Sequence, residues 1–387
     1  MSASDASDLL GQAQAAIAAR DPMTALDLIG RAEAIGGSNE RTCMARAAAL
    51  RASGDMKGAL AALDDLLSMQ PYHFMALLSK GTMLDQVGAR DAAIDTYRNA
   101  VRIAPPMERL PPAAARQLET ARSGVERANS ALRDHLAAAV ADLRGQFSTT
   151  DLGRFDEALD IFAGVKKAYV HEPLFLNFPR LPAIPFFDRS HFPWLEELEA
   201  ATDLVSEEMQ GALASAGESE LAPYIQYPPG APVNQWGELN HSRRWSSYFL
   251  WKDGVRQTQA CDRCPQTAAL LERLPICRQT DYAPTAMFSA LDARTHIPAH
   301  SGSTNVRLLV HLPLVLPGSA RFRVGNETRN WRMGQAWVFD DTIEHEAWND
   351  ADALRVILIF DVWNPLLTEA ERALVNAMLA ARKTFHI

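Results

Sequence analysis

The N-terminal third of the chain repeats itself with a period of 34 residues. Alanines, larger apolar residues, glycines and prolines each return at this interval. The columns in register are Ala25, Ala59 and Ala93; Ile29, Leu63 and Tyr97; Ala32, Leu66 and Ala100; Gly54 and Gly88; and Pro71 and Pro105. A fixed period of this length restricts the chain to a stack of similar units, because one such unit cannot bury its apolar face alone.

The residue types within the period indicate two helices per unit. Alanine allows helices to cross closely, and the recurring glycines stand where a turn must separate the two helices. Pro71 and Pro105 would end the second helix, since proline lacks an N–H donor. This pattern is the tetratricopeptide signature. The first unit departs from it with Arg20 at the turn position, as terminal repeats often do.

The composition along the chain predicts three regions. Tetratricopeptide repeats are expected over 1–106, either as a partner-binding surface or as a packing or dimerisation module. Ala-, Arg- and Leu-rich helical patterns indicate a helical linker region over 107–170. Short apolar runs separated by Pro, Gly and Asn follow over 171–387, after a helix at Phe192–Ala214. The predicted strands are Trp245–Trp251, Ala286–Leu291, Val306–Leu316, Arg321–Val324, Ala336–Phe339 and Arg355–Val362.

Many short strands at this spacing are typical of a jelly roll. The expected fold is therefore multidomain, with an N-terminal α-helical tetratricopeptide solenoid followed by a double-stranded β-helix (jelly-roll, cupin-like) domain.

Charge and composition exclude several classes of protein. The net charge is −9 and no Lys/Arg block occurs, which argues against a nucleic-acid partner. No run of about 18 apolar residues is present, so no membrane span is expected. The first residues show no secretory signal, which predicts a cytoplasmic location. Cys261 and Cys264 form a lone C-x-x-C, which we interpret as two free thiols rather than a redox pair or half of a zinc site.

Two histidines stand at the ends of predicted strands. His300 lies in the predicted turn before Val306, and His345 follows the strand Ala336–Phe339. Such ends can converge at the mouth of a jelly roll, where neutral imidazoles bind iron, zinc or copper. The alternative is a pair of surface-loop histidines without a metal. Non-haem Fe(II) oxygenases add a carboxylate, usually two residues after the first histidine, where this chain has Gly302.

Arg355 opens an apolar strand, where a lone buried charge would be costly. Its planar fork suits a carboxylate, so a 2-oxo diacid held between a metal and Arg355 would satisfy both groups. An internal ion pair with Asp340 or Asp361 is the alternative. Arg307 and His311 share one face of their strand. His311 could bond the acid's second carboxylate, or it could be a satisfied core histidine.

Four stretches resemble one known family. They are HSGSTNVRLLVHLPL (300–314), RVGNETRNWRMG (323–334), FDDTIEHEAWN (339–349) and RVILIFDVWNP (355–365). The chain from about residue 175 onward resembles the aspartyl/asparaginyl β-hydroxylase family. This resemblance implies a double-stranded β-helix that uses Fe(II), O2 and 2-oxoglutarate. The animal members also carry a tetratricopeptide region before the hydroxylase domain.

The resemblance also implies roles for residues by position. His300 and His345 match the two iron ligands and are implied to be catalytic together with Arg355. At Gly302 the family can lack the third, carboxylate ligand, and water then takes its place. Ser289 and Arg355 match residues that hold the distal carboxylate of 2-oxoglutarate.

Three further positions complete the implied site. His311 matches a residue near the other end of 2-oxoglutarate, and Trp245 matches an aromatic residue of the cosubstrate pocket. Arg307 matches a residue on the substrate side. The chain departs from the animal enzymes at Leu309, where they have an arginine.

The expected reaction is hydroxylation of an unactivated C–H bond with release of succinate and CO2. The expected target is the β-carbon of an Asp or Asn residue in a protein or peptide substrate, docked by the repeats. The alternatives are a lipid or small-molecule hydroxylase, a tetratricopeptide interaction scaffold with an inactive oxygenase-like domain, and a zinc hydrolase on the same histidines.

Overall fold

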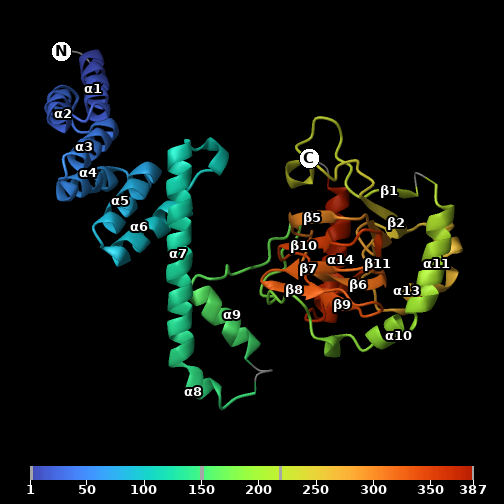
Figure 1. The fold of residues 1–387 in the computed structure, drawn as a ribbon. Coiled ribbons are helices and arrows are strands. Elements are labelled where there is room, and N and C mark those ends of the chain that lie inside the picture. Colours follow the sequence, from blue (N-terminus) through green and yellow to red (C-terminus); the bar gives the residue numbers. More distant parts are fainter. Residues whose placement is uncertain (1–2, 149–151, 218–219, 386–387) are drawn as a thin grey trace. The chain divides into compact units, whose positions relative to one another are not determined.

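The computed structural model describes residues 3–148, 152–217 and 220–385. The chain divides into two compact units, a helical unit, Met1–Lys166, and a β unit, Lys167–Ile387 (Figure 1). Among the described residues, no helix is both long and apolar enough to cross a membrane.

The helical unit begins with three helix pairs at the predicted interval. The helices are α1 (Ala3–Ala18) with α2 (Pro22–Gly36), α3 (Glu40–Ala52) with α4 (Met56–Met69), and α5 (Phe74–Gln86) with α6 (Arg90–Arg102). Gly54 and Gly88 occupy the turns within the second and third pairs, with φ of 87° and 81°. Arg20 takes φ of 61° in the first pair, so the turn keeps its left-handed geometry without glycine. The predicted tetratricopeptide arrangement is confirmed.

The stack continues beyond the third pair. After a short 3₁₀ helix (Met107–Arg109), α7 (Pro112–Ala139) packs Ala114 and Ala121 against Tyr97. Among the described residues of this unit, α8 (Ala141–Arg144) and α9 (Gly153–Phe162) follow. An ion pair of 3.2 Å between Arg133 and Asp160 ties α9 to α7.

The β unit contains two antiparallel sheets. The larger has the order β1-β2-β4-β11-β6-β9, with β3 paired to β2, and the smaller has the order β5-β10-β7-β8. The strands are β1 (Leu221–Pro223), β2 (Trp245–Lys252), β3 (Val255–Arg256), β4 (Ala286–Leu291), β5 (Thr295–His300), β6 (Arg307–Val315), β7 (Ala320–Val324), β8 (Glu327–Asn330), β9 (Trp337–Phe339), β10 (His345–Asn349) and β11 (Arg355–Trp363). The predicted jelly-roll class is confirmed.

Helices cover the outer face of the larger sheet (Figure 1). They are α10 (Leu195–Ala200), α11 (Thr202–Ser215), α12 (Thr258–Arg263) and α13 (Pro265–Arg273); α14 (Glu369–Thr384) packs separately, and short 3₁₀ helices span Arg189–His191 and Asn234–Trp236. Side chains alternate along each strand. In β11, Leu358 and Phe360 therefore pack toward the helices, whereas Ile357 and Ile359 pack toward the smaller sheet. Any residue in register with the second set faces the space between the sheets.

Two sequence predictions are wrong in detail. The predicted helix Phe192–Ala214 is two helices, α10 and α11, and the Thr202 hydroxyl donates to the Glu199 carbonyl at the break. His300 is not in a turn but ends strand β5. Strand β5 contains Pro298, which an edge strand tolerates because one side of it needs no N–H donor.

All four cysteines are free and buried. Burial raises the pKa of Cys261 to about 11 and that of Cys264 to about 12. Both thiols are therefore protonated at neutral pH and, as predicted, form no disulfide.

We expect Ala59→Leu to lower the free energy of unfolding of the helical unit by about 1–3 kcal/mol. Ala59 is fully buried in the cluster formed by α3, α4 and α5, so a larger side chain must push these helices apart. Urea unfolding followed by circular dichroism measures the change. Ala61→Leu, on the exposed side of α4, is the control and should shift stability by less than about 0.5 kcal/mol. Equal stability of the two variants would contradict a tight helix crossing.

Candidate functional site

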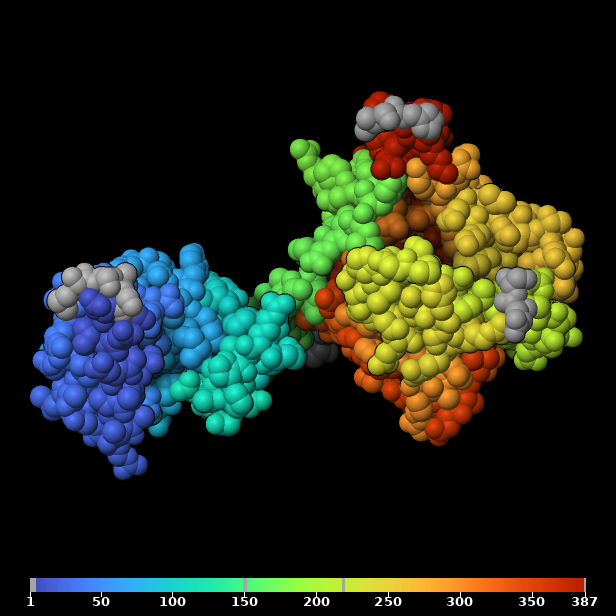
Figure 2. Space-filling view, turned by 90° about the horizontal axis from the view of Figure 1, so that it is seen from above, coloured from blue at the N-terminus to red at the C-terminus, as the bar shows by residue number. Residues whose placement is uncertain are grey.

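A pocket of about 1130 Å³ lies in the β unit. Figure 2 shows a hollow on this unit between green and yellow segments, which contribute Leu174 and Tyr224 to the pocket lining. The residues singled out from the sequence all line this pocket: Trp245, Ser289, His300, Arg307, His311, His345 and Arg355. The structure therefore brings together side chains from β2, β4, β5, β6, β10 and β11.

His300 and His345 face each other across the pairing of β5 with β10. Their ring centroids are 4.1 Å apart and their planes are inclined by 53°. His300 Nδ1 lies 2.8 Å from the Pro298 carbonyl, and His345 Nδ1 lies 3.0 Å from the Ile343 carbonyl. Because a carbonyl only accepts, each Nδ1 carries the proton and each Nε2 keeps its lone pair. Burial lowers the pKa of both rings, which keeps them neutral.

This pair fits a metal ion such as Fe(II), since a neutral imidazole with an oriented Nδ1–H is the usual form of a histidine ligand. Within 3–148, 152–217 and 220–385, no group of three or more His, Cys, Asp or Glu side chains is placed to hold a metal. The donor set that the described residues provide is therefore limited to the two histidines.

Asp341 fills the space in front of Gly302. The Gly302 N–H donates to the Asp341 carbonyl, and a Cβ added at Gly302 would overlap the Asp341 carboxylate. Asp341 lines the pocket, and burial, assisted by the neighbouring Asp340, raises its pKa to about 8. Asp340 instead forms an ion pair of 3.1 Å with His171. The carboxyl group nearest the usual third-ligand position therefore belongs to Asp341.

Arg355 is a buried cation that lacks an acidic partner in the described part of the chain. Its side chain is 1% exposed and its Nε has no hydrogen-bond partner. The guanidinium lies 5.4 Å from the Trp331 ring centroid, and burial lowers the pKa of Arg355 to about 9. The two acids considered as partners are engaged elsewhere, Asp361 with Arg307 at 3.2 Å and Asp340 as described above. The internal ion pair considered from sequence is therefore absent.

Ser289 and Trp245 lie on neighbouring strands of the larger sheet. The Trp245 Nε1–H donates to Ser289 Oγ at 3.1 Å. Ser289 is paired with Ile357 of β11, two residues from Arg355 on the same face. A hydroxyl and a guanidinium thus lie on one inner face of the pocket, where a carboxylate could accept from both.

His311 is not a satisfied core histidine. It is packed among aromatic rings, with Phe339 at 4.6 Å and Phe322 at 5.2 Å between centroids, and its Nδ1 has no partner. Burial, followed by the charge of Arg355, holds its pKa well below the usual range. Leu309 also lines the pocket, two residues before His311 on the same face of β6.

Arg307 is the first residue of β6. It donates to the Tyr282 carbonyl at 2.7 Å and is paired with Asp361. Asp361 in turn accepts from the Thr285 N–H at 2.7 Å. The positive charge of Arg307 is therefore partly neutralised within the pocket wall.

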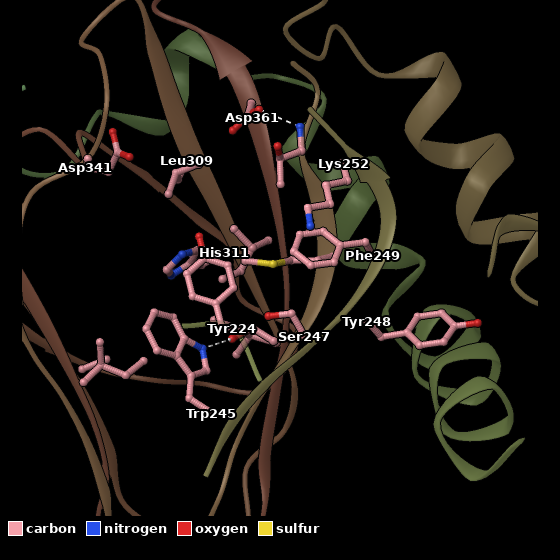
Figure 3. A pocket seen from close by; sticks show the side chains of 18 of the residues that line it. Tyr224, Trp245, Ser247, Tyr248, Phe249, Lys252, Leu309, His311, Asp341 and Asp361 are labelled. Carbon is pink, nitrogen blue, oxygen red and sulfur yellow. Dashed lines mark hydrogen bonds between the residues drawn. The ribbon is translucent and has the colours of Figure 1, made fainter. Parts of the chain in front are cut away.

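Aromatic and cationic side chains line the outer half of the pocket, and they were not predicted from the sequence (Figure 3). Tyr224 lies 4.3 Å from Trp245 between centroids, and Lys252 Nζ lies 5.1 Å from the Phe249 ring. Figure 3 shows Tyr248 directed away to the helices. The position of Phe249 on the pocket face could have been predicted from strand periodicity, because it is four residues after Trp245. Tyr224 lies in an aperiodic segment with no comparable signal.

We expect Gly302→Asp to destabilise the β unit rather than supply a third metal ligand. The new Cβ would compete with the Asp341 carboxylate for the same space, at a cost of about 1–3 kcal/mol in the free energy of unfolding. Urea unfolding measures the loss, and combining Gly302→Asp with Asp341→Gly should recover most of it. Gly211→Asp, at a helical glycine with open space around it, is the control. Wild-type stability of Gly302→Asp would show that Asp341 does not occupy this space.

Comparisons with known proteins identify related sequences. The sequence profile of the family described as aspartyl/asparaginyl beta-hydroxylase matches residues 203–365. The ornithine lipid ester-linked acyl 2-hydroxylase of Rhizobium tropici is 33% identical over 202 residues, which cover 51% of this chain and 67% of that protein. The human aspartyl/asparaginyl beta-hydroxylase is 41% identical over 144 residues, which cover 36% of this chain and 18% of that protein.

Human aspartate beta-hydroxylase domain-containing protein 2 is 29% identical over 215 residues, which cover 54% of this chain and 56% of that protein. The aligned part of this chain thus spans between 18% and 67% of the length of these curated relatives. On the strength of the profile match and the Rhizobium relative, this chain belongs to the aspartyl/asparaginyl beta-hydroxylase family.

Proposed function

We propose that the β unit is an Fe(II)- and 2-oxoglutarate-dependent dioxygenase that hydroxylates an unactivated C–H bond. One observation carries the proposal. A buried guanidinium without an acidic partner among the described residues shares a pocket with two neutral imidazoles whose Nε2 atoms are open. A diacid could bind the metal through one end and supply a negative charge to the guanidinium through the other.

Each end of 2-oxoglutarate would meet chemically suited groups. His300 and His345 would hold Fe(II), which with O2 and 2-oxoglutarate supplies the oxidation and releases succinate and CO2. Arg355 and Ser289 would hold the distal carboxylate. The desolvation cost of Arg355 is then offset by a charge-assisted bidentate contact.

The metal-proximal end would be held without a cation on β6. Leu309 occupies the position between Arg307 and His311 on the pocket face. Of the two polar residues that flank this position, Arg307 is paired with Asp361, whereas His311 has an unpartnered Nδ1. We therefore assign the proximal carboxylate to the metal and His311.

The outer half of the pocket would receive the substrate, with Arg307 on its wall. A polypeptide carrying Asp or Asn, hydroxylated at the β-carbon, is the first candidate. Lys252 and Arg307 offer positive charge to such a side chain, and the human relative is named for this reaction. The helical unit would dock the polypeptide, since stacked repeats present extended binding surfaces.

An acyl chain is the second candidate substrate. Leu309, Met287 and Phe249 give the same half an apolar wall, and the Rhizobium relative is named as an acyl hydroxylase of a lipid. Incubation of the iron-loaded full chain with 2-oxoglutarate and O2, and either Asp- and Asn-containing peptides or acyl lipids, separates the two. The product should gain the mass of one oxygen atom, with matching succinate formation.

We expect His345→Ala to weaken metal binding more than about tenfold, because it removes one of two protein ligands. Titration of the protein with Mn(II), followed by electron paramagnetic resonance, measures the affinity without turnover. His296→Ala is the matched control, since this exposed histidine is paired with Glu346 and stacked on Trp348. Wild-type Mn(II) affinity in His345→Ala would place the metal elsewhere and defeat the proposal.

We expect Arg355→Met to raise the stability of the protein but to weaken its binding of 2-oxoglutarate. Replacing a buried, unpaired charge with an apolar side chain of similar length should raise the free energy of unfolding of the ligand-free protein by about 1–4 kcal/mol. The same change should weaken 2-oxoglutarate binding to the Mn(II)-loaded protein about 100-fold, as isothermal calorimetry would measure. Arg321→Met, which removes the surface partner of Asp350, is the control and should leave this affinity unchanged. Undiminished 2-oxoglutarate affinity in Arg355→Met would contradict the assigned carboxylate site.

A further inference from the structure

Residues 171–178, here called the strap, run alongside the loop that follows His300. The Leu174 N–H donates to the Gly302 carbonyl at 2.9 Å, and Phe175 N–H donates to the Ser303 carbonyl at 2.9 Å. Further along, the Phe178 N–H donates to Asn305 Oδ1 at 2.7 Å. The strap lies outside residues 203–365, which the family profile matches, yet Leu174 lines the pocket with 78% of its surface exposed.

His171 fastens the beginning of the strap to the loop that carries Asp341. Its Nδ1 lies 3.1 Å from Asp340 Oδ2 and 3.0 Å from Thr342 Oγ1, and its Nε2 lies 3.1 Å from the Leu181 carbonyl. The Nε2 must donate to that carbonyl, and the carboxylate favours a proton on Nδ1. The contact with Asp340 raises the pKa of His171, and its side chain is only 12% exposed. His171 and Asp340 thus form a largely buried ion pair.

Further hydrogen bonds and an ion pair connect this region to residues on both sides of the His300 and His345 pair. Asp340 also accepts from the Thr342 N–H at 2.9 Å, and Thr342 in turn accepts from the Glu172 N–H at 2.8 Å. Just before the strap, the Tyr169 hydroxyl accepts from Arg323, which is paired with Glu346 next to His345. The strap is therefore bound to the loops on either side of the pocket.

A buried ion pair is a poor device for stability alone, because an apolar pair of similar volume serves as well or better. Its advantage is fixed geometry: Thr342 donates to Oδ1 of Asp340 and the His171 ion pair lies at Oδ2, so Asp340 is held from two directions, and with it the backbone of Asp341. The carboxyl group of Asp341 lies beside Gly302, where small shifts would change the space around the proposed metal site.

We propose that His171 is a positioning residue of the active site, which holds the strap and the Asp341 loop together at the mouth of the pocket. The inference rests on the proposed function. It assigns one wall of the pocket, which includes Leu174, to a segment that precedes the residues matched by the family profile.

The test compares the full chain with His171→Ala, His171→Asn and, as control, His191→Ala at an exposed position of the same unit. Hydrogen exchange followed by mass spectrometry should show faster exchange over 172–178 and over 302–305 in His171→Ala. Binding of 2-oxoglutarate to the Mn(II)-loaded variant should weaken roughly tenfold. His171→Asn should recover part of both effects, since its amide can donate to Asp340 from the place of Nδ1. The control should match the wild type.

A purely structural role predicts a different result. His171→Ala would then lower the unfolding midpoint but leave exchange over 302–305 and 2-oxoglutarate affinity unchanged, which would overturn the inference. If His171→Ala does not fold, the same comparison is made between His171→Asn and the wild type. Failure of the wild type to bind 2-oxoglutarate with Mn(II) would refute the proposed function instead, while the exchange over 302–305 would still report on the strap.

Discussion

The buried, unpaired charge of Arg355 is the constraint on which the other charged contacts of the pocket depend. β11 lies between β4 and β6 in the larger sheet, and alternate side chains of β11 face the space between the sheets. A cation there would normally capture the nearest acid. Arg307 engages Asp361 and His171 engages Asp340, so neither acid is left for it. The ion pairs of the pocket wall therefore leave Arg355 available for the proposed 2-oxoglutarate carboxylate.

The same arrangement explains the shape of the pocket. One strand face of β6 presents Arg307, Leu309 and His311 in succession, each two residues from the next. Charge, an apolar side chain and an open imidazole nitrogen thus follow one another from the outer half of the pocket inward. The alternation of a single strand would thus separate the proposed substrate region from the proposed 2-oxoglutarate region.

The sequence predicted the helical unit closely because its determinants are local. Turn glycines and crossing alanines recur at one period, and Arg20, which replaces the turn glycine in the first unit, keeps the same left-handed turn. The two histidines were found from residue type and spacing. Strand β5 was not, because Pro298 and polar neighbours hide its alternation. His171 and the contact of Asp341 with Gly302 depend on tertiary hydrogen bonds between distant segments, which no local pattern encodes.

The occupied space in front of Gly302 also limits how the proposed metal centre could evolve. A lineage with this arrangement cannot reach a two-histidine, one-carboxylate centre through a single substitution at that position, since the site of the new side chain is already taken. Position 341 would have to become smaller first, and that intermediate would lose a buried carboxyl group before gaining a ligand. Positions 302 and 341 are therefore coupled, and the side chain of Asp341 would oppose the gain of a carboxylate ligand at position 302.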